Sequence, residues 1–304
     1  MIKNNRNQAL IDKITQLKKE RNAVILAHNY QLGEVQDIAD FVGDSLDLSR
    51  KAAKTGAEVI VFCGVLFMAE TASILCPEKI VLLPEINAGC SMADMITAQK
   101  LKEEKKKHLN PCVICYVNSS AEVKAESDIC CTSANAIEIV KGLDETREIL
   151  FIPDQYLGHY VSTQLNRKIT LWPGYCPTHV RILPEDIIRL KAEHPKAKVI
   201  VHPECRPEVI SLADEVQSTG GMCKFAKETE ASEIIVGTEL GIIHRLRKEN
   251  PKKRLFTASE QAICPYMKLI TLEKIVWSLE KMQFQVKVPA EIANKARKAV
   301  DKML

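Results

Sequence analysis

Three of the eleven cysteines in this chain of 304 residues stand at equivalent places in a repeating pattern. Cys90, Cys176 and Cys264 each follow a strand-like segment and a short loop, and they are 86 and 88 residues apart. Three thiolates that converge from such places suit a metal centre, and a [4Fe–4S] cluster on three cysteines would keep one iron open to substrate. A structural zinc site prefers four protein ligands. The spacing therefore predicts a cluster, with a zinc site or buried core cysteines as the alternatives.

Several of the other cysteines have a simpler interpretation as small buried hydrophobes. Cys63, Cys115, Cys130 and Cys131 lie in apolar segments that are typical of buried strands. Cys112 and Cys115 have the spacing of a zinc or redox pair, but a strand places residues three apart on opposite faces. We therefore expect these cysteines to belong to the core.

Side chains with acid–base chemistry end three apolar segments. His28, Tyr116 and His202 occupy these ends and are 88 and 86 residues apart. Glu204 follows His202 by two residues, so the two side chains share one face of an extended chain. An imidazole beside a carboxylate suits proton transfer, because each group shifts the pKa of the other. A shared pocket is the functional prediction, and a buried ion pair between elements is the alternative.

Serine-containing segments recur with the same period. Ser45, Ser133 and Ser218 stand in the segments GDS, TSAN and STGG, which are typical of helix N-termini with Ser or Thr caps. Backbone N–H groups at such ends attract carboxylates and phosphates. The run from Ser218 through Gly220 is the best phosphate candidate, because glycine allows close approach of the backbone. Capping alone is the alternative for any one of these segments.

These landmarks share a period of about 87 residues, and strand-like segments alternate with amphipathic ones throughout. That alternation favours parallel α/β structure. We therefore predict three similar αβα units with about four parallel strands each, over residues 1–86, 87–172 and 173–271. Residues 272–304 are expected to form helices that pack back on the first unit. Ligands bind beyond the carboxyl ends of parallel strands, so pseudo-three-fold symmetry would direct the candidate residues to one central active site.

Composition excludes other classes of protein. Hydrophobic residues make up 46% and charged residues 27%, which is typical of a globular protein. The net charge of +3 gives no general attraction for nucleic acid or anionic membranes. There is no apolar run long enough to span a membrane and no signal-peptide pattern, so we expect a cytoplasmic protein with neither nucleic-acid nor membrane partners. Disulfides are rare in that compartment.

Ten motifs distributed along the chain resemble those of the quinolinate synthase family. They are AHNYQ (27–31), DIADFVGDSL (37–46), MAET (68–71), GCSMAD (89–94), YVNSSAE (116–122), CTSANA (131–136), PDQYLG (153–158), HPEC (202–205), STGGM (218–222) and GTELGIIHRL (237–246). The resemblance covers nearly the whole chain. It implies a three-domain α/β fold with pseudo-three-fold symmetry, in agreement with the repeat.

The resemblance also implies an activity and a cofactor. Members of the family condense iminoaspartate with dihydroxyacetone phosphate to quinolinate, a precursor of NAD, and phosphate and two waters leave. They carry a [4Fe–4S] cluster whose three cysteines match Cys90, Cys176 and Cys264 and whose open iron acts as a Lewis acid. The resemblance thus implies a transferase of NAD biosynthesis, supplied with iminoaspartate by an aspartate oxidase or dehydrogenase.

Pocket residues carry over individually from the resemblance. The matching positions are His28, Tyr30, Ser45, Tyr116, Asn118, Ser133, His202, Glu204, Ser218 and Thr219. We add His179 from the CPTH segment as a further pocket residue. Tyr30, His202 and Glu204 are the expected catalytic residues, because their side chains can exchange protons.

The remaining pocket residues are expected to bind substrate. Ser45, Ser133 and Asn118 would hold the two carboxylates, and the run Ser218–Thr219–Gly220 would hold the phosphate. Tyr116 would cover the site.

One departure and two rival functions complete the prediction. Some relatives carry a CxxCxxC run near the third cysteine, whereas this chain has only Cys264 there. The first rival is a different iron–sulfur dehydratase, which the choice of substrates would separate. The second is a non-enzymatic scaffold with a structural zinc or an electron-transfer cluster, which would need no pocket lined by Ser, His and Glu.

Overall fold

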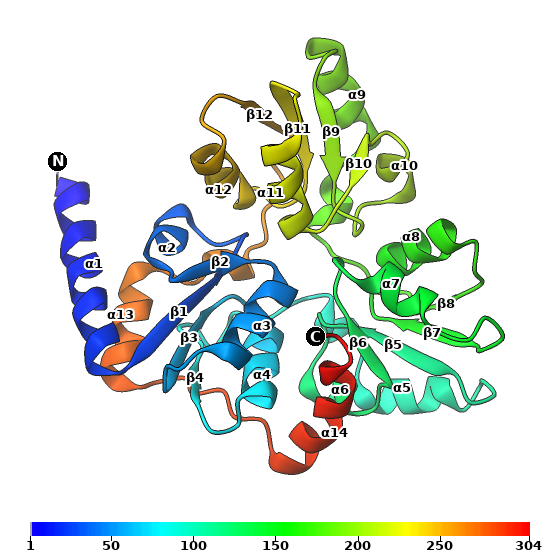
Figure 1. Cartoon of the computed structure of the whole chain (residues 1–304), viewed down its shortest axis with the longest axis horizontal. Coiled ribbons are helices and arrows are strands. Elements are labelled where there is room, and N and C mark those ends of the chain that lie inside the picture. The colour runs from blue at the N-terminus through cyan, green and yellow to red at the C-terminus, as the bar shows by residue number, and fades with distance from the viewer. Residues whose placement is uncertain (1) are drawn as a thin grey trace.

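The computed structural model describes residues 2–304, and within this range the strands form three four-stranded parallel sheets. All three sheets have the same strand order, β2-β1-β3-β4, β6-β5-β7-β8 and β10-β9-β11-β12. The strands are β1 (Ala23–His28), β2 (Phe41–Gly43), β3 (Val59–Cys63), β4 (Ile80–Leu82), β5 (Cys112–Tyr116), β6 (Ile129–Cys131), β7 (Ile149–Ile152), β8 (Thr170–Leu171), β9 (Lys198–Val201), β10 (Glu215–Val216), β11 (Glu233–Gly237) and β12 (Arg254–Thr257). The predicted fold class is confirmed (Figure 1).

The order of helices and strands repeats three times along the chain. Each repeat has four helices that alternate with four strands and is followed by a 3₁₀ turn. The helices are α1 (Ile2–Glu20), α2 (Gly33–Ile38), α3 (Ser45–Lys54), α4 (Leu66–Leu75), α5 (Ala98–Lys105), α6 (Ala121–Ala125), α7 (Ala136–Lys141), α8 (Gln155–Leu165), α9 (Pro184–Glu193), α10 (Pro207–Ile210), α11 (Thr219–Glu228) and α12 (Ile242–Glu249), with 3₁₀ turns η1 (Ala93–Met95), η2 (His179–Arg181) and η3 (Tyr266–Lys268). Each turn closely follows one of the three repeat cysteines, so each cysteine loop follows the last strand of a unit.

Buried apolar residues fill the two central strands of each sheet. Every residue of β3, β5 and β7 is buried, as expected for parallel strands with helices on both faces. A continuous core extends through the first two units into the third, and the third unit adds a smaller cluster that includes Ile187, Val199 and Ile235. This core fixes the strand ends from which the candidate site residues project.

Three aspartates, one in each unit, tie the first strand of a sheet to the second. Each carboxylate accepts the backbone N–H of a residue in the first strand, and each aspartate N–H donates to the carbonyl of that same residue. The pairs are Asp40 with Ile25, Asp128 with Val113 and Asp214 with Val199, at carboxylate distances of 2.7, 2.8 and 2.8 Å. The repeat is therefore preserved in hydrogen bonds as well as in strand order.

A basic side chain before the fourth strand of each unit makes a second set of repeated hydrogen bonds. Lys79, Arg167 and Lys253 each donate to carbonyl oxygens at the C-terminal end of the third helix of their unit. Arg167, for example, binds the carbonyl of Val140 at 2.9 Å. Because the last carbonyls of a helix lack backbone partners and carry partial negative charge, a cation is favourable there.

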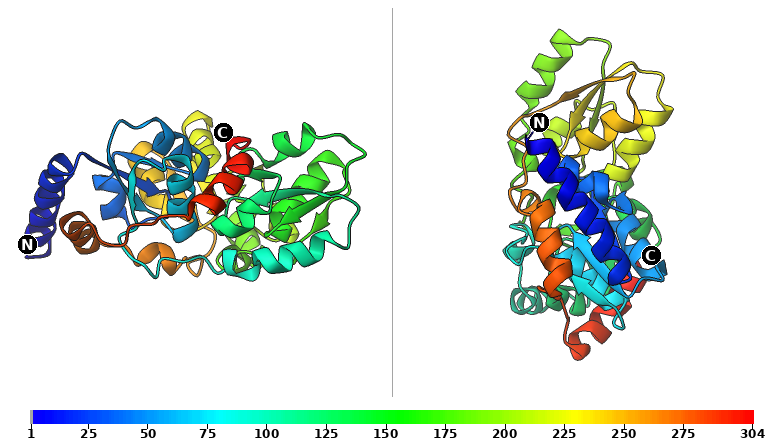
Figure 2. Two further views of the ribbon diagram at one scale, coloured as in Figure 1. Left: turned by 90° about the horizontal axis from the view of Figure 1, so that it is seen from below. Right: turned by 90° about the vertical axis from the view of Figure 1, so that its left-hand side faces the viewer.

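The C-terminal helices pack against two different units. Helix α13 (Leu272–Lys281) lies against α1 and β3 of the first unit, as the views in Figure 2 show. Helix α14 (Ala290–Asp301) packs mainly on α6 and β6 of the second unit and also contacts α4 of the first. The expectation that residues 272–304 pack on the first unit thus describes α13, whereas α14 also joins the first unit to the second.

No helix within residues 2–304 is both long enough and apolar enough to cross a membrane.

Replacement of Asp128 by alanine should destabilise the second unit. The N–H of the buried residue Val113 would lose its carboxylate partner, at a cost of about 1–3 kcal/mol in the free energy of unfolding. Asp128→Asn keeps an acceptor oxygen and should lose clearly less. Urea denaturation of both variants measures the difference, and equal losses in the two would contradict the role assigned to the carboxylate.

Candidate active site

The cysteines of the repeat meet at one cavity, where the three units adjoin. Cys90, Cys176 and Cys264 all line it and are partly exposed, whereas the other eight cysteines of the chain are buried. In Figure 1 the three sheets surround this common centre. The three cysteines that share the repeat position are thus the ones that reach the cavity.

Most of the other predicted site residues line the same cavity. They are His28, Tyr30, Ser45, Tyr116, Asn118, Ser133, His179, His202, Glu204 and Thr219. Ser218 and Gly220 are adjacent to the cavity wall but are not part of its lining. The buried Oδ1 of Asn118 has no hydrogen-bond partner in the described part of the chain, so it is available to a ligand.

The three thiols have the chemistry of metal ligands. Burial raises the pKa of the Cys90 thiol to about 12 and also raises the pKa values of Cys176 and Cys264. Such thiols ionise only beside a strong positive charge, which a bound metal or cluster supplies. Three sulfur donors from three units therefore fit a metal centre with an open coordination position. A second donor group, in which Cys176, His179 and Glu204 offer atoms within 4.8 Å of one another, could hold a single metal ion.

Glu204 is the charged centre of the cavity. One of its oxygens lies 2.7 Å from Nδ1 of His179, and the other accepts the hydroxyl of Tyr116 at 2.5 Å. Burial acts to raise the pKa of the Glu204 carboxyl, but the neighbouring imidazoles and the Tyr116 hydroxyl outweigh it and hold that pKa below its usual value. Glu204 is therefore an anion that is 3% exposed.

Two histidines and two tyrosines of the cavity are neutral. Burial lowers the pKa values of His28 and His202 from 6.5 to about 3, so both imidazoles are uncharged near pH 7. Burial also raises the pKa values of Tyr30 and Tyr116 well above their usual range, which keeps both phenols protonated. The cavity thus places the Glu204 carboxylate among neutral imidazoles and phenols.

A chain of hydrogen bonds connects Tyr30 to Glu204. The hydroxyl of Tyr30 lies 2.5 Å from Oγ1 of Thr238, which in turn lies 2.8 Å from Nε2 of His179. Nδ1 of the same imidazole contacts Glu204 and lies 3.1 Å from the sulfur of Cys176. His179, predicted only as an added pocket residue, is therefore central to the geometry of the site.

Of the three helix N-termini near the cavity, two lack the Ser or Thr cap that the sequence predicts. Asp44, not Ser45, caps α3, because its carboxylate accepts the N–H groups of Leu46 and Asp47. Ser218 caps α11 as predicted, and its hydroxyl also donates to Asp44 at 3.2 Å. An Asp side chain is as good a cap as Ser, so the GDS segment fits either residue.

At α7 the expected Ser or Thr cap is also absent. The residue that precedes the helix is Asn135, whose side-chain oxygen accepts from Thr132 rather than from the helix. Ser133 lies before the helix and faces His202, with Oγ 3.1 Å from Nε2 of the imidazole.

Sequence reasoning missed the residue that anchors the third cysteine loop. Glu239, which is fully buried after β11, accepts the N–H of Cys264 at 3.0 Å and that of Gly241 at 2.7 Å, and it pairs with Lys268 at 2.8 Å. Lys268 also donates to the carbonyl of Tyr30. Glu239 stands in the quoted motif GTEL, but its partners in space are not visible in the motif.

Lys124 is a second residue that the sequence did not reveal. Its ammonium group is fully buried and binds the carbonyl of Ser119 at 2.5 Å and that of Phe67 at 3.5 Å. Ser119 follows Asn118, and Phe67 lines the cavity. Lys124 therefore joins the first and second units directly behind the site.

Comparison with known proteins decides the family. The family model described as "Quinolinate synthetase A protein" matches residues 12–304. The chain belongs to this family. The resemblance that the motifs carry is thereby confirmed.

Relatives from distant organisms match along almost their whole length. The chain is 64% identical over 292 residues to a quinolinate synthase of Dehalococcoides mccartyi (strain CBDB1), with 96% of each chain covered. It is 56% identical over 295 residues to one of Methanosarcina barkeri (strain Fusaro / DSM 804), with 97% of each covered. A quinolinate synthase of Geotalea uraniireducens (strain Rf4) is 56% identical over 292 residues, with 96% of each covered.

Acidification should destabilise the protein through its buried histidines. His28 and His202 stay neutral in the folded chain down to about pH 3, but in the unfolded chain they take up protons below about pH 6.5. The unfolded state then binds more protons, so the free energy of unfolding falls with decreasing pH, by about 2 kcal/mol for each histidine at about pH 5. Urea denaturation at about pH 7.5 and pH 5 should therefore show a smaller loss for His202→Gln than for the wild type.

The exposed residue His159 offers a matched control, because His159→Gln should keep the wild-type dependence on pH. If His202→Gln lost as much stability between about pH 7.5 and pH 5 as the wild type, the assignment of a neutral buried imidazole would be contradicted.

Proposed function

We propose that this chain is a quinolinate synthase that condenses iminoaspartate with dihydroxyacetone phosphate, with release of phosphate and two waters, in the biosynthesis of NAD. The observation that carries the proposal is the convergence of Cys90, Cys176 and Cys264 on one cavity that also holds Glu204 and its hydrogen-bond partners. Membership of the family supports the reaction, and the names of the relatives agree with it.

The cavity offers suitable donors to the anionic substrates. Ser45 of the first unit and Ser133 of the second present hydroxyls to the cavity, and Asn118 presents its side-chain amide there. These groups are assigned to the two carboxylates of iminoaspartate, because hydrogen bonds to charged acceptors are the strong ones. Thr219, at the first position of α11, is assigned to the phosphate end of the other substrate.

The three cysteines are assigned to a [4Fe–4S] cluster. When bound there, the cluster would supply a Lewis-acid iron beside the cavity that facilitates loss of a hydroxyl group. The proposal needs only that these side chains hold the cluster at the cavity wall.

Proton transfer is assigned to the groups around Glu204. Its carboxylate can take a proton from a carbon or nitrogen of the substrate, and Tyr116 and His179 hold it in place. His202 is uncharged and can accept a proton at its ring, and the phenol of Tyr30 can donate one. Burial of all these groups excludes water, which protects reactive imine substrates from hydrolysis.

The setting of the enzyme follows from its chemistry. Iminoaspartate is the product of two-electron oxidation of aspartate, so an aspartate oxidase or dehydrogenase is the proposed supplier. All eleven cysteines are free, which suits a reducing cytoplasm.

Replacement of each cluster cysteine should abolish metal binding. Protein purified without oxygen should contain about four irons and four sulfides per chain, and Cys90→Ser, Cys176→Ser and Cys264→Ser should each lose most of both. Cys112→Ser, at a buried cysteine in β5, is the control and should keep them. Chemical analysis for iron, sulfide and zinc gives the result, and one zinc per chain in place of iron would overturn the assignment.

Glu204→Gln should remove the base while the cluster remains. We expect kcat for quinolinate formation to fall by about 10²- to 10⁴-fold, since an amide cannot accept the proton. Iron content should match the wild type, because Glu204 is not assigned as a ligand. Full turnover by Glu204→Gln would show that the carboxylate is not the base.

A further inference from the structure

A hydrogen bond between two units fixes the hydroxyl of Thr219. Thr219 begins α11 in the third unit, is 2% exposed and lines the cavity. Nδ2 of Asn29, which follows β1 in the first unit and is fully buried, lies 2.8 Å from the Thr219 hydroxyl oxygen. The direction of this bond decides where the hydroxyl proton points.

Arg245 determines that direction. Its guanidinium can only donate hydrogen bonds, and its Nη1 lies 2.8 Å from the side chain of Asn29. The Asn29 atom that faces Arg245 is therefore the carbonyl oxygen Oδ1. The atom that faces Thr219 is then the amide nitrogen, which donates to the hydroxyl oxygen.

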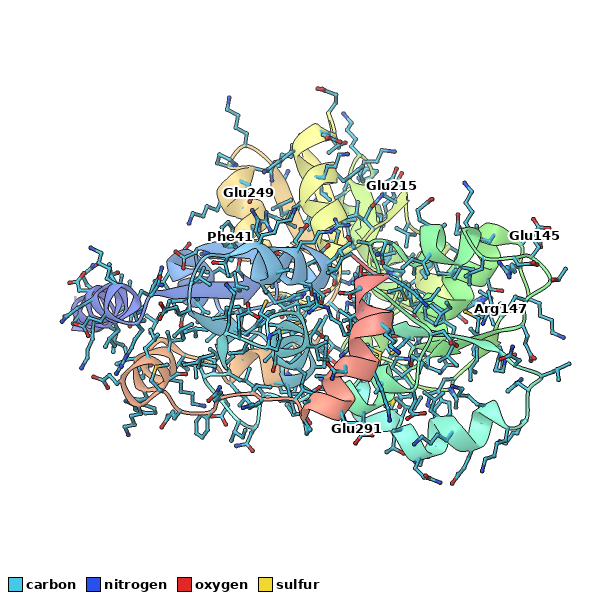
Figure 3. All side chains as sticks on the ribbon, turned by 60° about the horizontal axis from the view of Figure 1, so that its bottom comes forward. Phe41, Glu145, Arg147, Glu215, Glu249 and Glu291 are labelled. Atoms are coloured by element: carbon cyan, nitrogen blue, oxygen red, sulfur yellow. The ribbon has the colours of Figure 1, made fainter. Side chains whose placement is uncertain are left out.

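The position of Arg245 is itself held by three contacts. Nη1 also donates to the carbonyl of Val42 at 2.8 Å, and Nε donates to Glu249 at 2.7 Å. Glu249 lies next to the edge of the first unit at which Phe41 begins β2, as Figure 3 shows. Because the guanidinium is planar and anchored on both sides, rotation of the Asn29 amide would place two donors against each other.

The Thr219 proton is consequently free to point into the cavity. The hydroxyl oxygen accepts from Asn29, and in the described part of the chain the hydroxyl has no other side-chain partner. The neighbouring Ser218 differs, because its hydroxyl accepts from the N–H of Gly221 and donates to Asp44. Of these two hydroxyls at the start of α11, Thr219 alone is left as a donor to a ligand.

We propose that Asn29, held by Arg245, is a positioning residue that directs the Thr219 hydroxyl proton at an anionic oxygen of the substrate. A fixed hydroxyl donor in a buried site selects a group that only accepts hydrogen bonds, such as a phosphate or a carboxylate. The identity of the substrate rests on the function proposed above, whereas the direction of the hydrogen bonds does not.

Asn29→Asp tests the direction with almost no change of shape. Both oxygens of the aspartate accept, so the Thr219 hydroxyl would turn from the cavity and donate to residue 29. In the holoenzyme we expect KM to rise about tenfold for the substrate whose anion the hydroxyl binds, with a much smaller change in kcat. A higher KM for dihydroxyacetone phosphate, together with weaker inhibition by inorganic phosphate, would identify the phosphate as the group that Thr219 binds. A higher KM for iminoaspartate would identify one of its carboxylates.

A double-mutant cycle separates this effect from simple charge repulsion. Thr219→Val removes the donor and should raise the same KM. When Asn29→Asp is added to Thr219→Val, the KM should not rise further. A further loss in the double variant would mean that the new charge acts on the substrate directly, which overturns the proposal. Asn294→Asp on the exposed face of α14 is the control for added charge.

Binding of inorganic phosphate and of malonate, measured by calorimetry, tests the inference without turnover. If the chain forms no quinolinate but Asn29→Asp weakens the binding of one of these anions about tenfold, the proposed function fails and the role of Asn29 stands. Unchanged binding in Asn29→Asp, or no binding of either anion by the wild type, overturns the inference.

Discussion

Three thiols can share one cavity in this protein only if three separate sheets bring their strand ends to the same point. A single parallel sheet cannot do this, because its loops lie in a row along one edge. The chain meets the requirement by repeating one arrangement of strands, in which Asp40, Asp128 and Asp214 fix the start of each strand pair. The cysteine loops then leave their units at equivalent positions.

Side chains of the site make some of the contacts between the units. Tyr116 of the second unit binds Glu204 of the third, and Ser218 of the third binds Asp44 of the first. Buried polar contacts of this kind are strong when all partners are satisfied and costly when one is lost. Assembly of the units therefore also organises the cavity, because its lining comes from all three units.

The period that is visible along the chain was sufficient for the fold class and for part of the cavity lining, and the family resemblance added Tyr30, Asn118 and Thr219. Cys90, Cys176 and Cys264 could be separated from the other cysteines on the basis of the period alone. Glu239 and Asn29 could not be found in this way, since their roles depend on partners that only folding brings near. Asn29 binds Thr219 across 190 residues, and no local pattern encodes such a pair.

Two buried carboxyl groups near the cavity show how the fold separates charge. Asp154 caps α8 with one oxygen, and burial together with the charge of Glu204 raises its pKa well above the usual range. Glu204 has the opposite shift, because an imidazole and a phenol bind it. A pair of carboxyl groups whose pKa values are pushed apart in this way divides into an acid and a base. Glu204 is therefore the base of this pair, and it lies in the same cavity as the thiols. Glu239 lines that cavity as well, where its ion pair with Lys268 offsets its charge.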